Sequence, residues 1–313
     1  MKNLIVILLL LIVTIDAVAQ VKLRFASKEE AMEMIVEDDA YTNGWGSFDL
    51  DCRAGHKDAT KSEVLKMMQD NCLEYSDEEK DILAKCMSMI EDTLKSYGWT
   101  VPMPEEIVFV KTTMKEEGGA GGYTRKNRIY LSGANSTHWR SVRLVAHELF
   151  HVLTRNDAEF RRKMYSVIGF NVLDHEFEFA KDILDKRISN PDVSRYDSYA
   201  ELTIGDTKRP CTMMFYSDRE YDGGSFFTYS KIGLIPLDDE LKPIVRNGMT
   251  EIHPLEECSD FYDLVGNNTR YVINPEECLA DNFAALIVLS YMIEHVEPNN
   301  RIYNGVRKVL KGE

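Results

Sequence analysis

Apolar residues recur every three or four positions in several stretches of the chain, a pattern typical of helices with one buried face. One helical face would carry Ile82, Leu83, Cys86, Met89, Ile90 and Leu94. Ser76 and Glu79 precede this face with the spacing of a capping box, as Ser27 and Glu30 precede "AMEMIV". The pattern therefore predicts one helix after Ser27 and another after Ser76 that ends near Gly98.

Other stretches carry the period of strands or the composition of turns. The segments "EEIVFVKTT" (105–113) and "YTRKNRIYLSG" (123–133) are predicted as a strand and as an edge or hairpin strand. The glycine-rich "EEGGAGG" (116–122) links them. The segment "NGWGSFDLDCRAGHKD" (43–58) is rich in turn formers and is predicted as a loop, and residues 190–250 as short strands and turns.

Further helices are expected in the second half of the chain. Asp157 is a suitable N-cap for "AEFRRKMYSVIGF", and "EFAKDILDKRI" (178–188) predicts another helix. Asn274 as cap and Pro275 at the first position begin a long helix through "NPEECLADNFAALIVLSYMIEHV" (274–296). Helices and strands are thus both expected, and the fold class that we predict is α+β.

The N-terminal apolar run predicts export. Leu4 to Val13 is followed by Ala17 and Ala19 in the pattern that signal peptidase accepts, so cleavage is expected after Ala19. Asp16 interrupts the run before the roughly 20 residues that a membrane span needs. We therefore predict a signal peptide at 1–19, an N-terminal subdomain at 20–156 and a C-terminal subdomain at 157–313, with a periplasmic or extracellular location.

Composition narrows the classes of partner. With 44% hydrophobic residues in 313, the chain can form a sizeable core. The net charge of −15 argues against sequence-independent nucleic-acid binding, which needs clustered Lys and Arg. No later segment is apolar enough to span a bilayer, so no membrane span is expected in the mature chain. Six cysteines permit up to three disulfides without indicating their pairing, and the oligomeric state is not indicated.

The segment "VRLVAHELFHVLTRND" (142–157) carries the strongest chemical signal. On a helix, His147 and His151 share one face, so both imidazoles can point at one metal ion with Glu148 beside it. Buried imidazoles need partners for their ring nitrogens, and a metal supplies one. The alternative is a helix that carries two histidines with ordinary structural roles.

A catalytic zinc needs a third protein ligand and one position open to water. Glu277 is the candidate, with Asp281 four residues later able to accept the other ring N–H of His147. Adjacent Glu276 is the rival for the same role. Asp157, six residues after His151, is a local alternative ligand. This geometry would require a sharp turn at Thr154, a residue poorly suited to positive φ, so an N-cap role is favoured for Asp157.

"HELFH" (147–151) together with "ECLAD" (277–281) resembles the gluzincins, the thermolysin-containing group of zincin metallopeptidases. The order helix, strand, edge strand, motif helix over residues 76–156 also resembles the upper subdomain of zincins. The resemblance implies a zincin-like fold in which a small mixed sheet with a backing helix and an active-site helix precedes a mainly helical lower subdomain. Residues 190–250 would then be a short β insertion that separates the two motifs.

The same resemblance implies a mechanism. Zinc would bind His147, His151 and Glu277, Glu148 would act as general base, and a peptide or protein substrate would lie along the edge strand in 123–132. The oxyanion stabiliser could be His253, Tyr262 or Tyr271, without a basis for choosing among them.

Two other functions are compatible with these motifs. One is a secreted binding or structural protein that keeps the scaffold without catalysis, and the other is a zinc hydrolase of a non-peptide amide. Cys278 could pair with Cys258 or remain a buried thiol, and Cys52 could in principle ligate zinc in a latent form.

Overall fold

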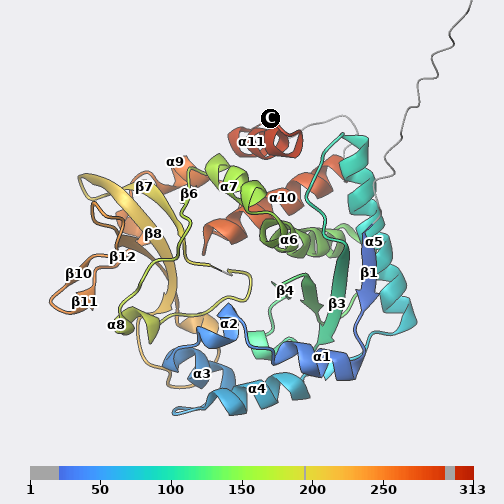
Figure 1. The fold of residues 1–313 in the computed structure, drawn as a ribbon, viewed down its shortest axis with the longest axis horizontal. Coiled ribbons are helices and arrows are strands. Elements are labelled where there is room, and N and C mark those ends of the chain that lie inside the picture. The colour runs from blue at the N-terminus through green and yellow to red at the C-terminus, as the bar shows by residue number, and fades with distance from the viewer. Residues whose placement is uncertain (1–20, 194, 293–299) are drawn as a thin grey trace, which may run out of the picture.

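The computed structural model describes residues 21–193, 195–292 and 300–313 (Figure 1). Helices and β-sheets both contribute to the fold, which confirms the α+β class. The predicted signal peptide at 1–19 lies outside the described residues. In the described part of the chain, no helix is both long and apolar enough to cross a bilayer.

The first sheet has the strand order β1-β3-β5-β4, and β2 also pairs with β3. Its strands are β1 (Lys22–Phe25), β2 (Cys72–Leu73), β3 (Glu106–Thr112), β4 (Gly122–Arg125) and β5 (Arg128–Leu131). The stretch 123–133, predicted as an edge or hairpin strand, forms most of the antiparallel hairpin β4–β5. Among the described strands, β4 forms one edge of this sheet and β1 the other.

Both faces of β3 are buried. Ile107 and Phe109 pack into the cluster formed with the helices α5 (Asp77–Ser96) and α6 (Trp139–Asn156). Val108 and Val110 face the opposite side, where the helices α1 (Lys28–Ile35) and α4 (Lys61–Asp70) supply the apolar residues. Because side chains alternate along a strand, this near-continuous apolar run gives a sheet covered on both faces.

The capping boxes predicted at Ser27 and Ser76 are both present, and they begin α1 and α5. The segment 43–58 was predicted as a loop but contains the helix α3 (Ser47–Ala54), and the short helix α2 (Ala40–Asn43) ends at its first residue. Glycines mark the ends of α3: Gly46 is its N-cap, and Gly55 ends it in the left-handed conformation. The turn formers of this segment are therefore the caps of a short helix, because glycine readily supplies the positive φ of a C-terminal cap.

A second, antiparallel sheet follows the helix α7 (Ala158–Val167) and has the order β12-β9-β8-β7-β6 (Figure 1, left). Its strands are β6 (Asn171–Val172), β7 (Ser198–Ile204), β8 (Thr207–Ser217), β9 (Ser230–Pro236) and β12 (His253–Pro254). A small hairpin joins β10 (Val245–Arg246) to β11 (Met249–Thr250). The helix predicted within 178–188 is only the single turn α8 (Lys181–Leu184), and α9 (Phe261–Val265) and α11 (Arg301–Leu310) complete this half.

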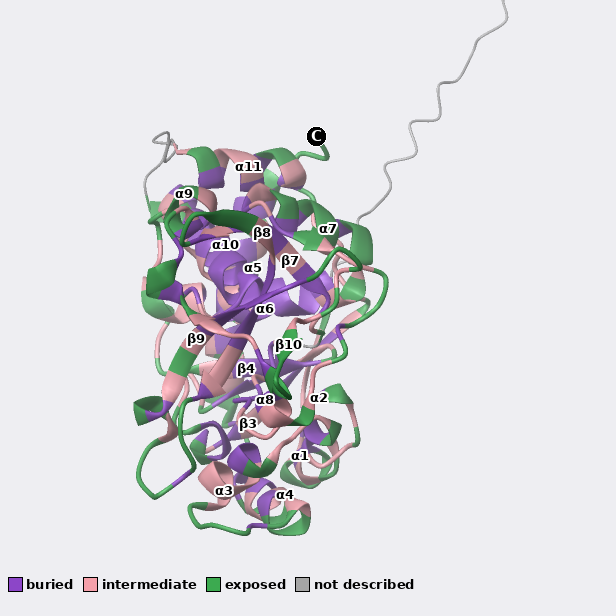
Figure 2. Cartoon of the chain, turned by 90° about the vertical axis from the view of Figure 1, so that its left-hand side faces the viewer, coloured by how far each residue is buried: buried purple, intermediate pink, exposed green. Residues whose placement is uncertain are grey.

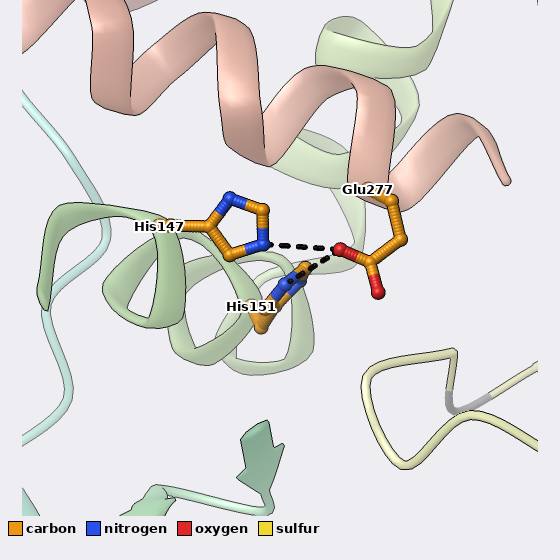
Figure 3. Close-up of side chains that lie close together, drawn as sticks. All are labelled: His147, His151 and Glu277. Atoms are coloured by element: carbon orange, nitrogen blue, oxygen red, sulfur yellow. Dashed lines mark hydrogen bonds and ion pairs between the residues drawn. The ribbon is translucent and has the colours of Figure 1, made fainter. Parts of the chain in front are cut away.

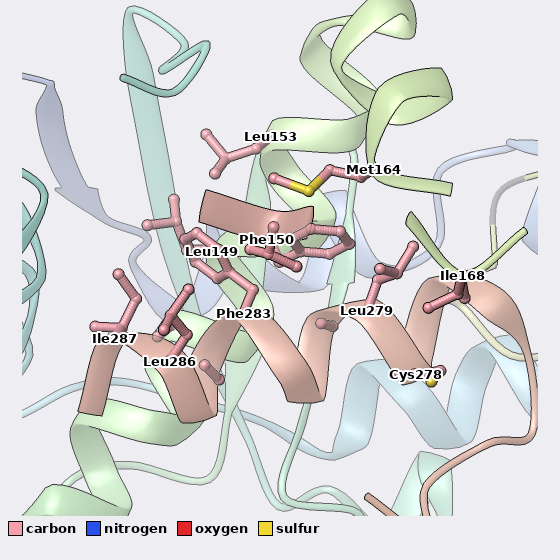
Figure 4. Packing of buried hydrophobic residues seen from close by; sticks show 14 of the residues in the cluster. Leu149, Phe150, Leu153, Met164, Ile168, Cys278, Leu279, Phe283, Leu286 and Ile287 are labelled. Carbon is pink, nitrogen blue, oxygen red and sulfur yellow. The ribbon is translucent and has the colours of Figure 1, made fainter. Parts of the chain in front are cut away.

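The helix α10 (Pro275–Met292) packs along α6, and this pair forms the centre of the core. Figure 4 shows Leu149, Phe150 and Leu153 of α6 facing Leu279 and Phe283 of α10. The rings of Phe150 and Phe283 lie 5.6 Å apart. Buried residues concentrate on these helices in Figure 2, whereas α3 and α4 carry exposed faces. The packing holds the two predicted motif helices against each other.

All six cysteines lie in the described part of the chain and carry free thiols. The alternative disulfide between Cys258 and Cys278 is therefore not formed, and the alternative of a buried thiol at Cys278 is what the structure shows. Burial raises the pKa of the Cys278 thiol to about 12, which keeps it protonated and unreactive at neutral pH.

Candidate metal centre

His147 and His151 lie one turn apart on α6 with their ring centroids 4.9 Å apart. The apolar face of α6 is buried, and it carries His151 inward with it. His151 is fully buried, whereas the side chain of His147 keeps 13% of its surface exposed at the mouth of a cavity. The sequence spacing thus places one imidazole in the core and one at the solvent boundary.

Glu277 reaches this histidine pair from the first turn of α10. Asn274 caps the helix by accepting a hydrogen bond from the backbone N–H of Glu276 at 2.9 Å, as predicted. Oε2 of Glu277 lies 3.0 Å from Nε2 of His147 and 3.5 Å from Nε2 of His151 (Figure 3). The structure therefore brings the three predicted ligands together at a site that could hold a metal ion.

The ring of His151 is oriented by Glu276, the predicted rival of Glu277. Nδ1 of His151 lies 3.1 Å from Oε1 of Glu276. The same carboxylate accepts hydrogen bonds from the hydroxyls of Thr154, at 2.5 Å, and Tyr165, at 2.7 Å. Glu276 thus contacts the far side of the ring, and Nε2 of His151 is turned toward Glu277.

Nε2 of His151 is buried and has no hydrogen-bond partner among the described residues. A buried polar atom without a partner is costly, and such atoms in native proteins call for an explanation. A metal ion bound between the imidazoles and Glu277 would supply the missing partner. Two histidines and a glutamate are also a donor set that zinc takes in catalytic sites.

The charges around His151 favour a cation. Burial alone would lower the pKa of His151, but the carboxylates of Asp192, Glu276 and Glu277 outweigh burial and raise this pKa well above its usual value. Burial would raise the pKa of Glu277, yet the contacts with both histidines lower it below its usual range. The site therefore attracts positive charge, which a divalent ion would also satisfy.

Glu148, the predicted general base, is buried beside the histidines. Its Oε2 accepts a hydrogen bond from the hydroxyl of Thr124 on β4 at 2.9 Å. Burial raises the pKa of Glu148 above its usual value, against the opposing effect of His147 and His151. The raised pKa makes this carboxylate a stronger base than an exposed glutamate, which suits a role in proton transfer.

Asp281 does not form the hydrogen bond expected with His147. Its Oδ1 lies 3.9 Å from Nδ1 of His147, which is too long for a hydrogen bond. Arg143, one turn before His147 on α6, donates to the same oxygen at 2.6 Å. Arg143 therefore donates to the Asp281 carboxylate that was predicted to accept a hydrogen bond from His147.

The local alternative ligand, Asp157, is not part of the site. Its carboxylate accepts a hydrogen bond from the backbone N–H of Phe160 at 2.8 Å and caps α7. The N-cap role predicted for this residue is confirmed, and the carboxylate belongs to neither of the groups that could hold a metal.

Of the three candidate oxyanion stabilisers, Tyr271 lies at the site. Its hydroxyl donates to Oε1 of Glu277 at 3.3 Å, and its ring centroid lies 5.9 Å from that of His147. His253 instead contacts Glu251 and Glu257, and neither it nor Tyr262 is among the residues that line the described cavities.

Two cavities meet at the site. One, of about 390 Å³, is lined by His147, Glu148 and Arg143. The other, of about 400 Å³, extends toward Phe226, and both are lined by Gly122 and Tyr271. Cys52 lines the second cavity, and burial raises the pKa of its thiol to about 12.

Sequence reasoning missed two residues of the site, Asn190 and Asp192. The side-chain amide of Asn190 donates to Oε1 of Glu277, and Asp192 forms a second possible metal-holding group with Glu148 and His151. Both residues lie in the irregular segment between α8 and β7. No periodicity or motif marks them, and only the tertiary fold brings them to α6.

The arrangement gathers imidazoles, carboxylates and a tyrosine hydroxyl around one point, which suits binding of a divalent cation and acid–base chemistry beside it. Comparison of the chain with protein-family models, with curated proteins and with solved structures finds no match.

Proposed function

We propose that this chain is an exported zinc-dependent metallopeptidase with a gluzincin-like site on a zincin-like fold. One observation carries the proposal: Nε2 of His147, the unpartnered Nε2 of His151 and Oε2 of Glu277 converge while Glu148 lies beside them. Export is supported by the apolar run before Ala19.

The order of elements around the site supports the fold assignment. The helix α5 backs the first sheet, β4 forms its edge, and α6 follows directly after β5 with the histidine pair. The second sheet lies between α7 and α10 in the sequence and accounts for the long separation of the two motifs.

His147, His151 and Glu277 would hold the zinc. When bound there, zinc would polarise the scissile carbonyl and lower the pKa of a coordinated water toward about 7. Glu148 accepts the proton of the attacking water and returns it to the leaving amine, and the hydroxyl of Thr124 keeps its carboxylate in position. Glu276 fixes the His151 ring so that Nε2 faces the ion.

The substrate would be bound by the remaining parts of the site. The edge strand β4 offers backbone groups to an extended peptide, and Gly122 leaves room beside the carboxylate of Glu148. The hydroxyl of Tyr271 is hydrogen-bonded to Glu277, one of the proposed zinc ligands. From this position it would donate a hydrogen bond to the oxyanion that develops on a substrate carbonyl at the zinc. A polypeptide is therefore the substrate class we assign.

This function is tested by metal analysis of the purified wild-type chain and of the variants Glu148→Gln and Glu277→Ala. We expect about one zinc per chain, retained in Glu148→Gln with hydrolysis of a peptide library lost, and bound weakly by Glu277→Ala. Glu256→Gln, an exposed carboxylate on another element, is the control and should change neither quantity. Full zinc content in Glu277→Ala would reject the ligand set, and a zinc-free wild type would reject the enzyme.

A further inference from the structure

The segment Ser189–Asp192 contacts the candidate metal centre at Glu277 and His151 and is fixed at several points. Arg155 of α6 donates to the backbone oxygens of Pro191 and Asp192, each at 2.8 Å. The side-chain amide of Asn190 contacts Glu277, and the side-chain oxygen of Asn190 accepts from the N–H of Asp192 at 2.9 Å. The segment is therefore tied both to α6 and to a predicted ligand.

The carboxylate of Asp192 is hydrogen-bonded to a backbone N–H of the edge strand β4. Its Oδ1 accepts a hydrogen bond from the N–H of Thr124 at 2.6 Å, and Thr124 is fully buried beneath it. The N–H groups along a sheet edge are the donors that an added strand would use. At this point of β4, the Asp192 carboxylate accepts the hydrogen bond that a backbone carbonyl of a bound peptide would accept.

The same carboxylate faces the unpartnered nitrogen of His151. Oδ1 of Asp192 lies 3.9 Å from Nε2 of His151, and the Asp192 side chain is 7% exposed. Glu148, His151 and Asp192 offer ligand atoms within 4.8 Å of one another. This group shares His151 with the group of His147, His151 and Glu277, so the two possible metal-holding groups adjoin at that imidazole.

We propose that Asp192 is a further protein ligand of the same metal and that this conformation is the latent form of the site. The inference rests on the proposed function. A catalytic zinc site keeps one position open for water, whereas a site with four protein ligands is closed. In the latent form the Asp192 carboxylate fills that position, and Ser189–Asp192 covers β4.

Opening is an exchange of ligands and breaks no covalent bond. The Asp192 carboxylate leaves the ion and the N–H of Thr124, and water and the substrate backbone take the two places. The segment lines the cavity of about 400 Å³ beside the site, which gives it space to move. Asn190 links this movement to Glu277, because the two side chains are hydrogen-bonded in the closed form.

Azide binding to the cobalt-loaded full chain tests the inference. Azide binds to an open coordination position and changes the visible spectrum of the cobalt ion. We compare wild type, Asp192→Asn and the control Asp206→Asn, an exposed carboxylate in the turn between β7 and β8. The asparagine can still accept from Thr124 but is a poorer ligand. We expect Asp192→Asn to bind azide at least tenfold more tightly than the other two proteins and to lose cobalt to a chelator more readily.

Arg155→Gln provides a second variant that changes no metal-binding side chain. It loosens the hold on Pro191 and Asp192, so azide should again bind more tightly than in wild type. If Asp192→Asn does not fold, this variant decides alone. Azide affinity and cobalt retention equal to wild type in the folded variants would overturn ligation by Asp192 while leaving the three-ligand centre intact. A wild type that binds neither cobalt nor zinc would overturn the proposed function as well.

Discussion

Nδ1 of His151 lies 3.1 Å from Oε1 of Glu276, and this contact determines which nitrogen of the ring faces the metal centre. Glu276 is itself held by the hydroxyls of Thr154 and Tyr165. Burial would raise the pKa of Glu276, but the contact with His151 lowers it, so the carboxylate is charged. A charged acceptor at Nδ1 fixes the tautomer in which Nε2 carries the lone pair for a metal.

Glu276→Gln should therefore weaken metal binding without removing any ligand. Loss of such an orienting carboxylate typically lowers metal affinity by about 10–100-fold. Competition with a chromogenic chelator measures the affinity, and circular dichroism confirms the fold. Glu256→Gln serves as the matched control, and an unchanged affinity in Glu276→Gln would contradict the orienting role.

The helices that form and support the candidate metal centre could be predicted from local sequence. Capping residues and apolar periodicity predicted α5 and α10, and the histidine spacing predicted the shared face on α6. The helix α3 was missed because the glycines that cap it and the aspartates within it have the composition of a loop. In a segment of this kind, tertiary contacts such as the buried ion pair between Arg53 and Glu117 stabilise the helix.

The contacts that assemble the rest of the site depend on the tertiary fold. Asp192 reaches His151 from an irregular segment, and nothing in its neighbourhood in the sequence marks it as a metal-site residue. Arg143 was overlooked as a competitor for Asp281 because the two residues are 138 positions apart. Spacing rules describe neighbours on one helix, but they do not say which third side chain arrives from elsewhere.

Acid stability should depend on Glu37, which lies in the loop after α1. Arg128 donates to Glu37 at 2.9 Å, and this contact, aided by Lys126 and opposed by burial, lowers the pKa of Glu37 to about 2. A carboxylate with a lowered folded-state pKa stabilises the protein above its unfolded pKa, and this contribution is lost as the pH falls toward the folded value.

Glu37→Gln should accordingly lower the free energy of unfolding by about 1 kcal/mol at pH 7, a value discounted for its partial exposure. The difference from wild type should shrink between about pH 5 and pH 2. Urea unfolding at several pH values, with a chelator present so that metal binding does not contribute, measures it. Glu33→Gln, exposed on α1, is the control. A difference that stays constant across this range would contradict the assignment.

Tyr271→Phe should reduce turnover while leaving the metal in place. The hydroxyl donates to Glu277 at 3.3 Å, but Glu277 keeps its contacts with Asn190 and His147 when that hydroxyl is removed. Loss of one oxyanion donor typically lowers kcat by about 10²–10³-fold. Steady-state kinetics on a peptide substrate, with metal content measured in parallel, tests the role. Tyr262→Phe is the control, and an effect on KM alone would assign Tyr271 to substrate binding.

Gly121 and Gly122 provide a matched pair of substitutions beside Glu148, the proposed general base. A Cβ at Gly122 would lie 2.8 Å from Oε1 of Glu148 and 2.7 Å from Cδ2 of Leu131, whereas a Cβ at Gly121 would meet only the flexible end of Leu144 at 3.3 Å. Gly122→Ala should therefore displace the carboxylate of Glu148 and lower kcat at least tenfold, since small displacements of catalytic groups are costly. Gly121→Ala should stay close to wild type. Both variants should bind one zinc, because neither touches a ligand, and equal kinetics in the two would show that Glu148 tolerates the shift.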